Sequence, residues 1–340
     1  MEKPVRRIGL KHGSGGRAMR QLIEDVFLPL ATPVDGVGLS ALDDGAAIRV
    51  GDRWLVVTTD SHVVQPIFFP GGDIGRLSVS GTVNDLAMMG ATEPLALTCA
   101  AIIEEGFARA DLERIVASMR ETAREASAPI VTGDTKVMGK GELDGIVLNT
   151  AGVAFADRVV TDAGLAPGDR LIVTGTVGDH GMAIMSVRHR LGLEGDLRSD
   201  VAPVNGLVRA ALAAGGADVV AMKDPTRGGV AGVLHEMAAK AKVGIVLDEQ
   251  ALPVRDEVRA ACEMVGIDPL LVANEGKAVI GVRPGSAEKV LAALRAHPLG
   301  RHAAIVATAI ADRPGAVILD TGFGKRMLAE PEGELLPRIC

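Results

Sequence analysis

Short runs rich in aliphatic and β-branched residues alternate with segments of helical periodicity along the whole chain. The runs that predict strands are 54–59, 95–103, 146–155, 170–174, 219–222, 277–282 and 303–310. Apolar residues recur at helical spacing over 112–123, in a helix that must end before Pro129, and again over 230–241. The pattern predicts a mixed α and β fold (α/β or α+β) in which each half supplies strands, a Gly-rich turn and an amphipathic helix.

A turn-rich segment, Gly-Leu-Ala-Pro-Gly-Asp at 164–169, separates the two halves, and we place a domain boundary there. The predicted division is an N-terminal segment with a Gly-rich loop (1–35), a first domain (36–160), a second domain (165–321) and a mobile tail (322–340). The tail is expected because the periodicity fades after Asp320 and because Pro331 and Pro337 interrupt any helix.

Composition and charge exclude several classes of protein. The 340 residues are 48% hydrophobic, enough for one large core or two ordinary ones. The net charge of −7 and the scarcity of aromatic residues, with 6 Phe, 1 Trp and no Tyr, argue against nucleic-acid binding. No apolar run reaches the roughly 20 residues of a membrane helix, and no apolar segment follows the N-terminal basic residues as in a signal peptide. We expect a soluble, cytoplasmic protein with reduced cysteines.

Aspartates recur beside small residues, at what the pattern predicts to be strand ends. The positions are Asp43, Asp44, Asp60, Asp85, Asp134 and Asp224. Several carboxylates without a His or Cys cluster are typical of a site for a hard cation such as Mg²⁺, held between protein and a nucleoside triphosphate. Any one of these residues is equally well explained as a turn or helix-capping aspartate, but their number favours the metal interpretation.

Two Gly-rich loops are candidates for phosphate contacts. Thr226 and Gly228 directly precede the second helix, so we expect Thr226 to be its N-cap, with free N–H groups beyond it facing an anion. The loop Gly13, Ser14, Gly15, Gly16 is the other candidate, although it does not match the P-loop pattern. An ordinary capped helix and a flexible N-terminal segment are the simpler alternatives.

Lys136 and Glu275 are charged residues among small or apolar neighbours, and we expect both to be partly buried. A buried charge suits a general base or a phosphate contact, and it suits a salt bridge equally well. Cys99 and Cys262 fall in apolar segments and are expected to be buried and inert. Cys340 ends the tail, where a thiol has no packing role.

These residues belong to motifs that carry a family resemblance. The motifs are His12–Gly16, Leu42–Ala46, Thr59–His62, Pro66–Gly72, Asn84–Gly90, Thr132–Lys136, Asp224–Gly229, Asn274–Gly276 and Pro337–Cys340. With them, the chain resembles, essentially from end to end, the HypE family of hydrogenase expression/formation proteins. That family belongs to the superfamily of aminoimidazole ribonucleotide synthetase, selenophosphate synthetase and thiamine monophosphate kinase. The Pro-Arg-Ile-Cys ending distinguishes HypE within the superfamily.

The resemblance implies a two-domain architecture like that of aminoimidazole ribonucleotide synthetase, with ATP and Mg²⁺ bound between the domains. It implies metal ligands Asp44, Asp60, Asp85 and Asp224, and nucleotide contacts by Gly13, Ser14, Gly15, Gly16, Asp43, Asp60, Asp85, Asp134, Thr226 and Gly228. Which of Asp43 and Asp44 binds the metal stays open.

The implied activity is ATP-dependent dehydration of a carbamoyl group on the Cys340 thiol to a thiocyanate, which supplies the cyanide ligand of the [NiFe]-hydrogenase iron. Lys136, Glu275 and Asn274 are the other catalytic candidates, with Asn274 as an orienting amide. Which of Lys136 and Glu275 is the base stays open. The implied partners are the carbamoyltransferase HypF, the HypC–HypD iron scaffold complex and a second copy of the chain in a homodimer.

Two other functions remain compatible with the motifs. One is another enzyme of the superfamily, such as selenophosphate synthetase or a small-molecule kinase. Selenophosphate synthetase uses a reactive Cys or selenocysteine in the N-terminal glycine loop, where this chain has Ser14. The other is a nucleotide-binding scaffold without catalysis, whose tail docks on a partner and would tolerate loss of the Cys340 thiol.

Overall fold

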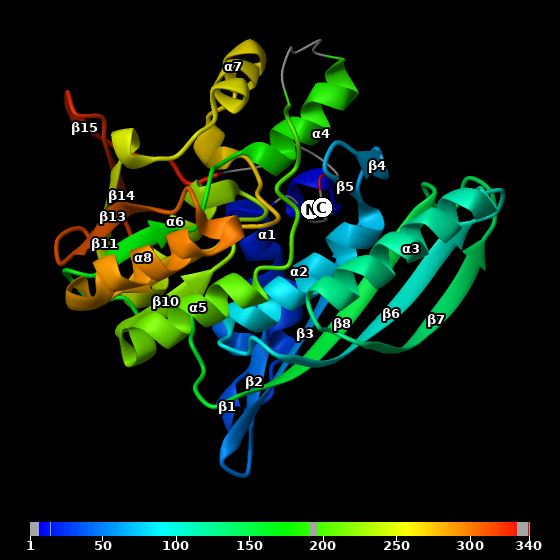
Figure 1. The fold of residues 1–340 in the computed structure, drawn as a ribbon, viewed down its shortest axis with the longest axis horizontal. Helices are drawn as coiled ribbons and strands as arrows, with labels where there is room; N and C mark the ends of the chain where they lie inside the picture. The colour runs from blue at the N-terminus through cyan, green and yellow to red at the C-terminus, as the bar shows by residue number, and fades with distance from the viewer. Residues whose placement is uncertain (1–6, 14, 191–195, 332–338, 340) are drawn as a thin grey trace, which may run out of the picture.

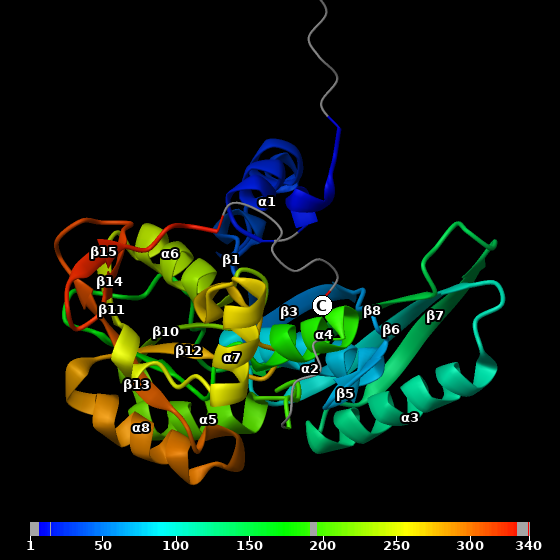
Figure 2. The ribbon, with the colours of Figure 1, turned by 90° about the horizontal axis from the view of Figure 1, so that it is seen from above.

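The computed structural model describes residues 7–13, 15–190, 196–331 and 339. Two mixed β-sheets lie side by side, each with helices packed on it (Figures 1 and 2). The first sheet has the order β1 (Gly36–Val37), β2 (Ala46–Val50), β3 (Arg53–His62), β8 (Ile146–Ala156), β6 (Pro94–Glu104) and β7 (Ile130–Met138). Its neighbouring strands are antiparallel except for the parallel pair β6 and β7.

The second sheet contains the strands of the C-terminal half. Their order is β10 (Val219–Lys223), β12 (Val279–Val282), β9 (Arg170–Val173), β13 (Ala304–Ile310), β11 (Gly244–Asp248), β14 (Val317–Asp320) and β15 (Lys325–Met327). Only β11 and β14 run parallel. A separate ribbon, β4 (Phe68–Phe69) with β5 (Gly72–Asp73), precedes the helix that joins the two halves.

Helices cover both faces of the second sheet. The α-helices of the described residues are α1 (Arg17–Leu22), α2 (Ile74–Met88), α3 (Arg109–Glu125), α4 (Asp179–His189), α5 (Asn205–Gly215), α6 (Gly229–Ala241), α7 (Asp256–Val265) and α8 (Ala287–Ala296). Leu171 and Val173 of β9 pack in one cluster with α6, whereas Ile172 between them packs in another with α5 and α8. A strand buried on both faces is a continuous apolar run, which is the pattern seen in the sequence.

Helix α2 lies at the junction of the two halves (Figure 1). The Asp73 side chain caps it, accepting a hydrogen bond from the Arg76 N–H at 2.9 Å. It packs on β3 and β8 of the first sheet, on α3, and on α5 of the second half. Small residues such as Ser78, Ser80 and Thr82 are fully buried on it, because the backbone approaches its neighbours closely. This helix carries one of the predicted site residues, Asp85.

The mixed fold class, the seven predicted strands and both predicted helices are confirmed. Three features differ from the expectations. Asn84 and Asp85 lie in helix α2 and not at a strand end, because a helix buried on all sides shows no amphipathic stripe. Asp134 and Lys136 lie inside β7, whose residues are all exposed, so it lacks the alternation of a half-buried strand. Finally, β15 pairs with β14 and extends regular structure beyond residue 321.

Within the described ranges, none of the helices has both the length and the apolar character needed to span a membrane.

Candidate active site

Five carboxylates approach one another where the two halves of the chain meet. Asp44 precedes β2, Asp60 lies in β3, Asp85 lies in the last turn of α2, Asp224 follows β10, and Glu275 lies in the loop before β12. Burial raises the pKa of Asp85 well above its ordinary value, and the charges of Asp224, Asp60 and Asp44 raise it further. The strands and helix of the first half thus bring three carboxylates to two from the second half.

Thr58 of β3 ties two of these segments together. Its Oγ1 lies 2.9 Å from both the Asp44 carbonyl oxygen and Asp85 Oδ2. Asp60 follows Thr58 by two residues in the same strand, and its Oδ2 lies 3.0 Å from His62 Nε2. Burial alone would raise the pKa of Asp60, but the charges of His62 and Arg227 outweigh it, so that the pKa is lowered. Asp60 is therefore the carboxylate of the cluster that most readily carries a negative charge.

Gly81 of α2 makes this arrangement possible. A Cβ at that position would lie 2.6 Å from His62 Nε2 and 3.1 Å from Asp60 Oδ2. The missing side chain lets β3 place the Asp60 carboxylate directly against the helix that carries Asp85.

Glu275 is 3% exposed, and its Oε1 is buried without a hydrogen-bond partner among the residues described. Burial raises its pKa well above the ordinary range, helped by the charges of Asp224 and Asp60. Its main chain is held on both sides: the N–H donates to Asp200 Oδ1 at 3.0 Å, and the carbonyl accepts from Asn84 Nδ2 at 3.3 Å. A fixed, desolvated carboxyl with an open oxygen suits proton transfer.

Asn274 is fully buried, and its side chain bonds only to main-chain groups within the described chain. Oδ1 accepts from the Gly178 N–H at 2.7 Å, and Nδ2 donates to the carbonyls of Pro225 (3.2 Å) and Val272 (3.1 Å). It links the loop of Glu275 to the loop of Asp224 and to the start of α4. The expectation that Asn274 is an orienting amide in catalysis stays a prediction.

Sequence reasoning missed Lys223, the residue before Asp224. Its Nζ lies 2.5 Å from Asp44 Oδ1 and 3.5 Å from both Asp162 Oδ2 and Glu236 Oε2. Burial would lower its pKa, but these carboxylates outweigh burial and raise the pKa well above the ordinary value. The available signal was a lysine directly after the apolar run of β10, a place where a charge must find partners.

The Asp43 carboxylate accepts hydrogen bonds from two main-chain N–H groups. Its Oδ1 accepts from the Asp44 N–H at 3.0 Å and its Oδ2 from the Asp162 N–H at 3.2 Å. Burial and the charge of Asp162 raise its pKa to about 7. These bonds hold the loop before β2, whereas Asp44 Oδ2 has no hydrogen-bond partner in the part of the chain described.

The donor set fits Mg²⁺ shared with phosphates. The unpartnered oxygens of Asp44 and Glu275 and the raised pKa of Asp224, about 8 through burial and the charge of Asp44, mark a place where carboxylates outnumber the cations near them. Carboxylate oxygens are the ligands that Mg²⁺ prefers, and it is commonly held by one or two of them together with phosphates. Among the described residues, no three His, Cys, Asp or Glu side chains could hold a metal ion by themselves. The set of four aspartate ligands stays a prediction.

The two Gly-rich loops meet. Gly15, with φ of +80°, packs against the main chain of Arg227, where a Cβ would lie 3.0 Å from the Arg227 carbonyl carbon. Gly16 packs in the same way against Pro331. The expectation that Thr226 caps the second helix was wrong: α6 begins at Gly229 and its N-cap is Gly228 at φ of +82°. Gly13 is exposed, and Ser14 lies outside the described residues.

Asp134 and Lys136 lie apart from the cluster. The strand order separates β7 from β3 by three strand spacings, about 14 Å. None of the described contacts joins either residue to the carboxylates, and the expectation that Lys136 is partly buried was wrong, because the whole strand is exposed.

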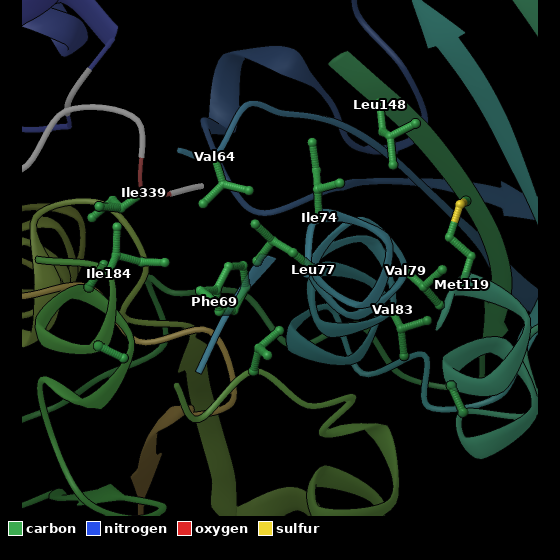
Figure 3. Close-up of a cluster of buried hydrophobic side chains, with 14 of the residues drawn as sticks. Val64, Phe69, Ile74, Leu77, Val79, Val83, Met119, Leu148, Ile184 and Ile339 are labelled. Atoms are coloured by element: carbon green, nitrogen blue, oxygen red, sulfur yellow. The ribbon is translucent and has the colours of Figure 1, made fainter. Parts of the chain in front are cut away.

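The cysteines follow the expectations in part. Cys262 is buried as expected, whereas Cys99 is half-buried. Cys340 lies outside the described residues, but its neighbour Ile339 is 6% exposed and belongs to the same core cluster as Val64 and Ile184 (Figure 3).

Comparison with known proteins identifies the family. The models for the N-terminal and C-terminal domains of AIR synthase related proteins match residues 42–156 and 166–320. The carbamoyl dehydratase HypE of Rhizobium leguminosarum bv. viciae is 50% identical over 338 residues, covering 98% of this chain and 95% of the relative.

Two solved structures extend the likeness. HypE in a HypE–HypF complex superposes with a TM-score of 0.85 at 44% identity, covering 91% of this chain and 99% of the other. HypE in complex with ATP superposes with a TM-score of 0.81 at 42% identity, covering 98% and 100%. The chain belongs to the HypE family of carbamoyl dehydratases, within the AIR synthase related proteins.

Proposed function

We propose that this protein dehydrates a carbamoyl group carried on its own Cys340 thiol, using ATP, and so makes the cyanide ligand for the iron of [NiFe]-hydrogenase. The observation that carries the proposal is the convergence of Asp44, Asp60, Asp85 and Asp224 with Glu275 at the junction of the two halves. Membership of the HypE family supports it, as does the solved relative that binds ATP.

The reaction divides into two steps that balance. The carbamoyl oxygen first attacks the γ-phosphorus of ATP, the bond to the β-phosphate oxygen breaks, and ADP leaves. Two N–H protons are then removed while the C–O bond breaks, so that phosphate departs with the oxygen and a C≡N bond forms. The oxygen of the formal water ends in inorganic phosphate, and no oxidant or reductant is consumed.

Glu275 is the group we assign to proton removal. It is buried, its Oε1 is open, and both sides of its main chain are held. Asn274 positions it by joining its loop to the loop of Asp224. Burial at this position also limits water, which would otherwise hydrolyse the activated carbamoyl group.

Mg²⁺ would be held by residues of the set Asp44, Asp60, Asp85 and Asp224 together with the phosphates, and when bound it supplies positive charge against the transferred phosphoryl group. Asp60 retains its charge most readily in this cluster because its pKa is lowered. The loop of Gly15 packs against the turn of Arg227, and we place the nucleotide beside these two segments.

The partners follow from the chemistry. A carbamoyltransferase must load the thiol, and the solved complex of a relative with HypF supports that protein in the role. A scaffold that holds iron, which we take to be the HypC–HypD complex, must accept the cyanide. We place the reaction in the cytoplasm, since Cys340 has to remain a free thiol between cycles.

We further propose that the protein works as a homodimer joined through β7. This strand pairs only with β6 among the described strands and exposes Val131 (62%) and Val137 (69%). Beside it, α3 and the sheet enclose an apolar groove of about 880 Å³ lined by residues such as Ile115 and Met119. A second copy pairing along this edge would cover both features and would place Lys136 at the interface.

Intact mass spectrometry tests the reaction. Protein carbamoylated on Cys340, by HypF or by cyanate, is expected to lose one water when MgATP is added, and Cys340→Ala protein is expected to bind nucleotide but to show no such loss. If the carbamoyl group persists while ATP is hydrolysed, the protein is a different ATP-dependent enzyme of the superfamily.

The same assay separates the two candidates for the base. Glu275→Gln is isosteric and should still bind ATP but should stop the loss of water in a single turnover. Lys136→Met should slow dehydration only if a second copy brings the residue to the site, an effect that disappears when β7 pairing is broken by Val137→Lys. Normal dehydration in Glu275→Gln would remove Glu275 as the base.

A further inference from the structure

The penultimate residue of the chain is docked inside the molecule. Ile339 is 6% exposed and packs in one cluster with Val64, Phe69 and Ile184, which come from the segments around β3, β4 and α4 (Figure 3). The Ile339 carbonyl belongs to the peptide group that carries Cys340. Whatever holds this carbonyl therefore acts one peptide group away from the reactive residue.

His180, the second residue of α4, is that holder. It is fully buried, and its Nε2 lies 2.5 Å from the Ile339 carbonyl oxygen. Because a carbonyl oxygen only accepts, Nε2 must carry the proton. Nδ1 lies 2.8 Å from Ser199 Oγ, so the Ser199 hydroxyl donates to the neutral ring. Phe69 packs edge-on against the imidazole at 5.5 Å between ring centroids.

The neutral tautomer agrees with the surroundings of the ring. Burial lowers the pKa of His180, opposed by the Asp200 charge and the bond to Ile339. The imidazole is thus oriented on three sides, by a hydroxyl, an aromatic edge and the last peptide group of the chain.

The same turn of α4 also holds the Asn274–Glu275 loop. The Gly178 N–H donates to Asn274 Oδ1 at 2.7 Å, and the Gly181 N–H donates to the Ala273 carbonyl at 3.1 Å. On the other side of the ring, Ser199 is followed by Asp200, whose Oδ1 accepts the Glu275 N–H at 3.0 Å. The anchor for Ile339 and the support of Glu275 are therefore built from the same two short segments.

We propose that His180 is a positioning residue that clamps the Ile339–Cys340 peptide group and so sets the carbamoylated thiol against Glu275. This inference rests on the proposed function, and it adds a residue outside the motifs that carry the family resemblance. The side chain of Ile339 supplies apolar burial, and the His180 N–H supplies direction. We therefore expect the clamp to affect delivery of the thiol and not the binding of ATP.

Three variants of the full-length protein test the clamp. His180→Leu removes the donor, His180→Gln keeps a donor of similar reach, and Ile339→Asp disfavours docking without changing the body of the protein. His235→Leu is the matched control, because His235 is also buried and also contacts a main-chain carbonyl, that of Leu328 at 3.1 Å.

The first readout is the rate at which iodoacetamide alkylates Cys340 in the uncarbamoylated protein, measured by peptide mass spectrometry. Loss of a buried hydrogen bond should raise this rate about tenfold in His180→Leu and in Ile339→Asp. His180→Gln and His235→Leu should resemble the wild type. This readout does not depend on dehydration, so it tests the clamp even if the proposed function fails.

The second readout is single-turnover dehydration of carbamoylated protein. His180→Leu and Ile339→Asp should slow it about tenfold with unchanged affinity for ATP, and His180→Gln should restore it. Unchanged alkylation in both His180→Leu and Ile339→Asp overturns the proposal. Loss of ATP affinity in parallel with dehydration, or failure of His180→Gln to restore the rate, also overturns it, because either result marks His180 as a general structural residue.

Discussion

Lys223 and Asp44 form a buried ion pair that joins the two halves of the molecule, with Nζ 2.5 Å from Oδ1. Lys223 ends β10 of the second sheet, and Asp44 precedes β2 of the first. Their side chains are 11% and 9% exposed, and Asp162 and Glu236 complete the group around the ammonium. The position of Asp44 in the site thus depends on a residue from the opposite half.

Replacing Lys223 by Met should destabilise the protein by about 3 kcal/mol, because it leaves buried carboxylates without their cation. Thermal unfolding of the metal-free protein would measure the loss. Lys325→Met is the control, since Lys325 is 60% exposed in its pair with Asp320 and an exposed ion pair contributes little to stability. Equal effects of the two substitutions would contradict a structural role for the buried pair.

Asp85→Asn should abolish most ATP turnover, by about 100-fold or more, while the fold is retained. The neutral amide removes a carboxylate from a cluster in which Asp224, Asp60 and Asp44 already oppose its ionisation, so the metal-free protein should not lose stability. Steady-state phosphate release and thermal unfolding measure the two effects. Asp157→Asn, at a side chain 92% exposed, serves as the control, and undiminished turnover in Asp85→Asn would exclude Asp85 from the site.

Metal-free protein should lose stability as the pH rises from about 4 to about 8, with the decline levelling off above the raised pKa values of two buried aspartates. The pKa of Asp43 is raised to about 7 and that of Asp224 to about 8, from an ordinary value of 3.8, mainly by burial. Between these values the folded state binds protons that the unfolded chain releases, so stability is greatest at low pH and falls through the folded pKa. Melting temperatures in EDTA from pH 6 to 9 measure it, and Asp224→Asn should flatten the decline. A melting temperature that rises over this range would refute the expectation.

Gly81→Ala should destabilise the protein by about 1–3 kcal/mol and weaken nucleotide binding, because the new Cβ would lie 2.6 Å from the buried His62 ring. Gly232→Ala is the matched control. Gly232 is also a buried helical glycine, but a Cβ there meets only the Arg227 carbonyl oxygen at 3.6 Å. That substitution should be neutral or slightly stabilising. Similar nucleotide affinities and melting temperatures for the two variants would show that Gly81 does not set the Asp60 and His62 geometry.

The order of apolar and polar residues was sufficient to predict helices and strands whose burial is regular along the chain. The stripe of α3 and the apolar runs of β9 and β12 were recognised because burial follows a regular period or is continuous along them. Asp224 and Glu275 were also recognised from the sequence, because each is a carboxylate next to an apolar run, where a charge requires a partner or a function. The pattern also marked Asp44 and Asp85 beside small residues, but it placed Asp85 at a strand end, whereas the residue lies in helix α2.

The tertiary structure alone decided which charges meet. His62 and His180 show no local signal that separates them from ordinary residues, and Lys223 shows only its place after an apolar run. They matter because strands and helices distant in sequence bring Asp60, Ile339 and Asp44 to them. The same packing puts Lys136 three strands away from Asp60. Side-chain periodicity reports how one element faces its core, whereas the geometry of a site depends on how several elements pack, and that information is distributed over the whole chain.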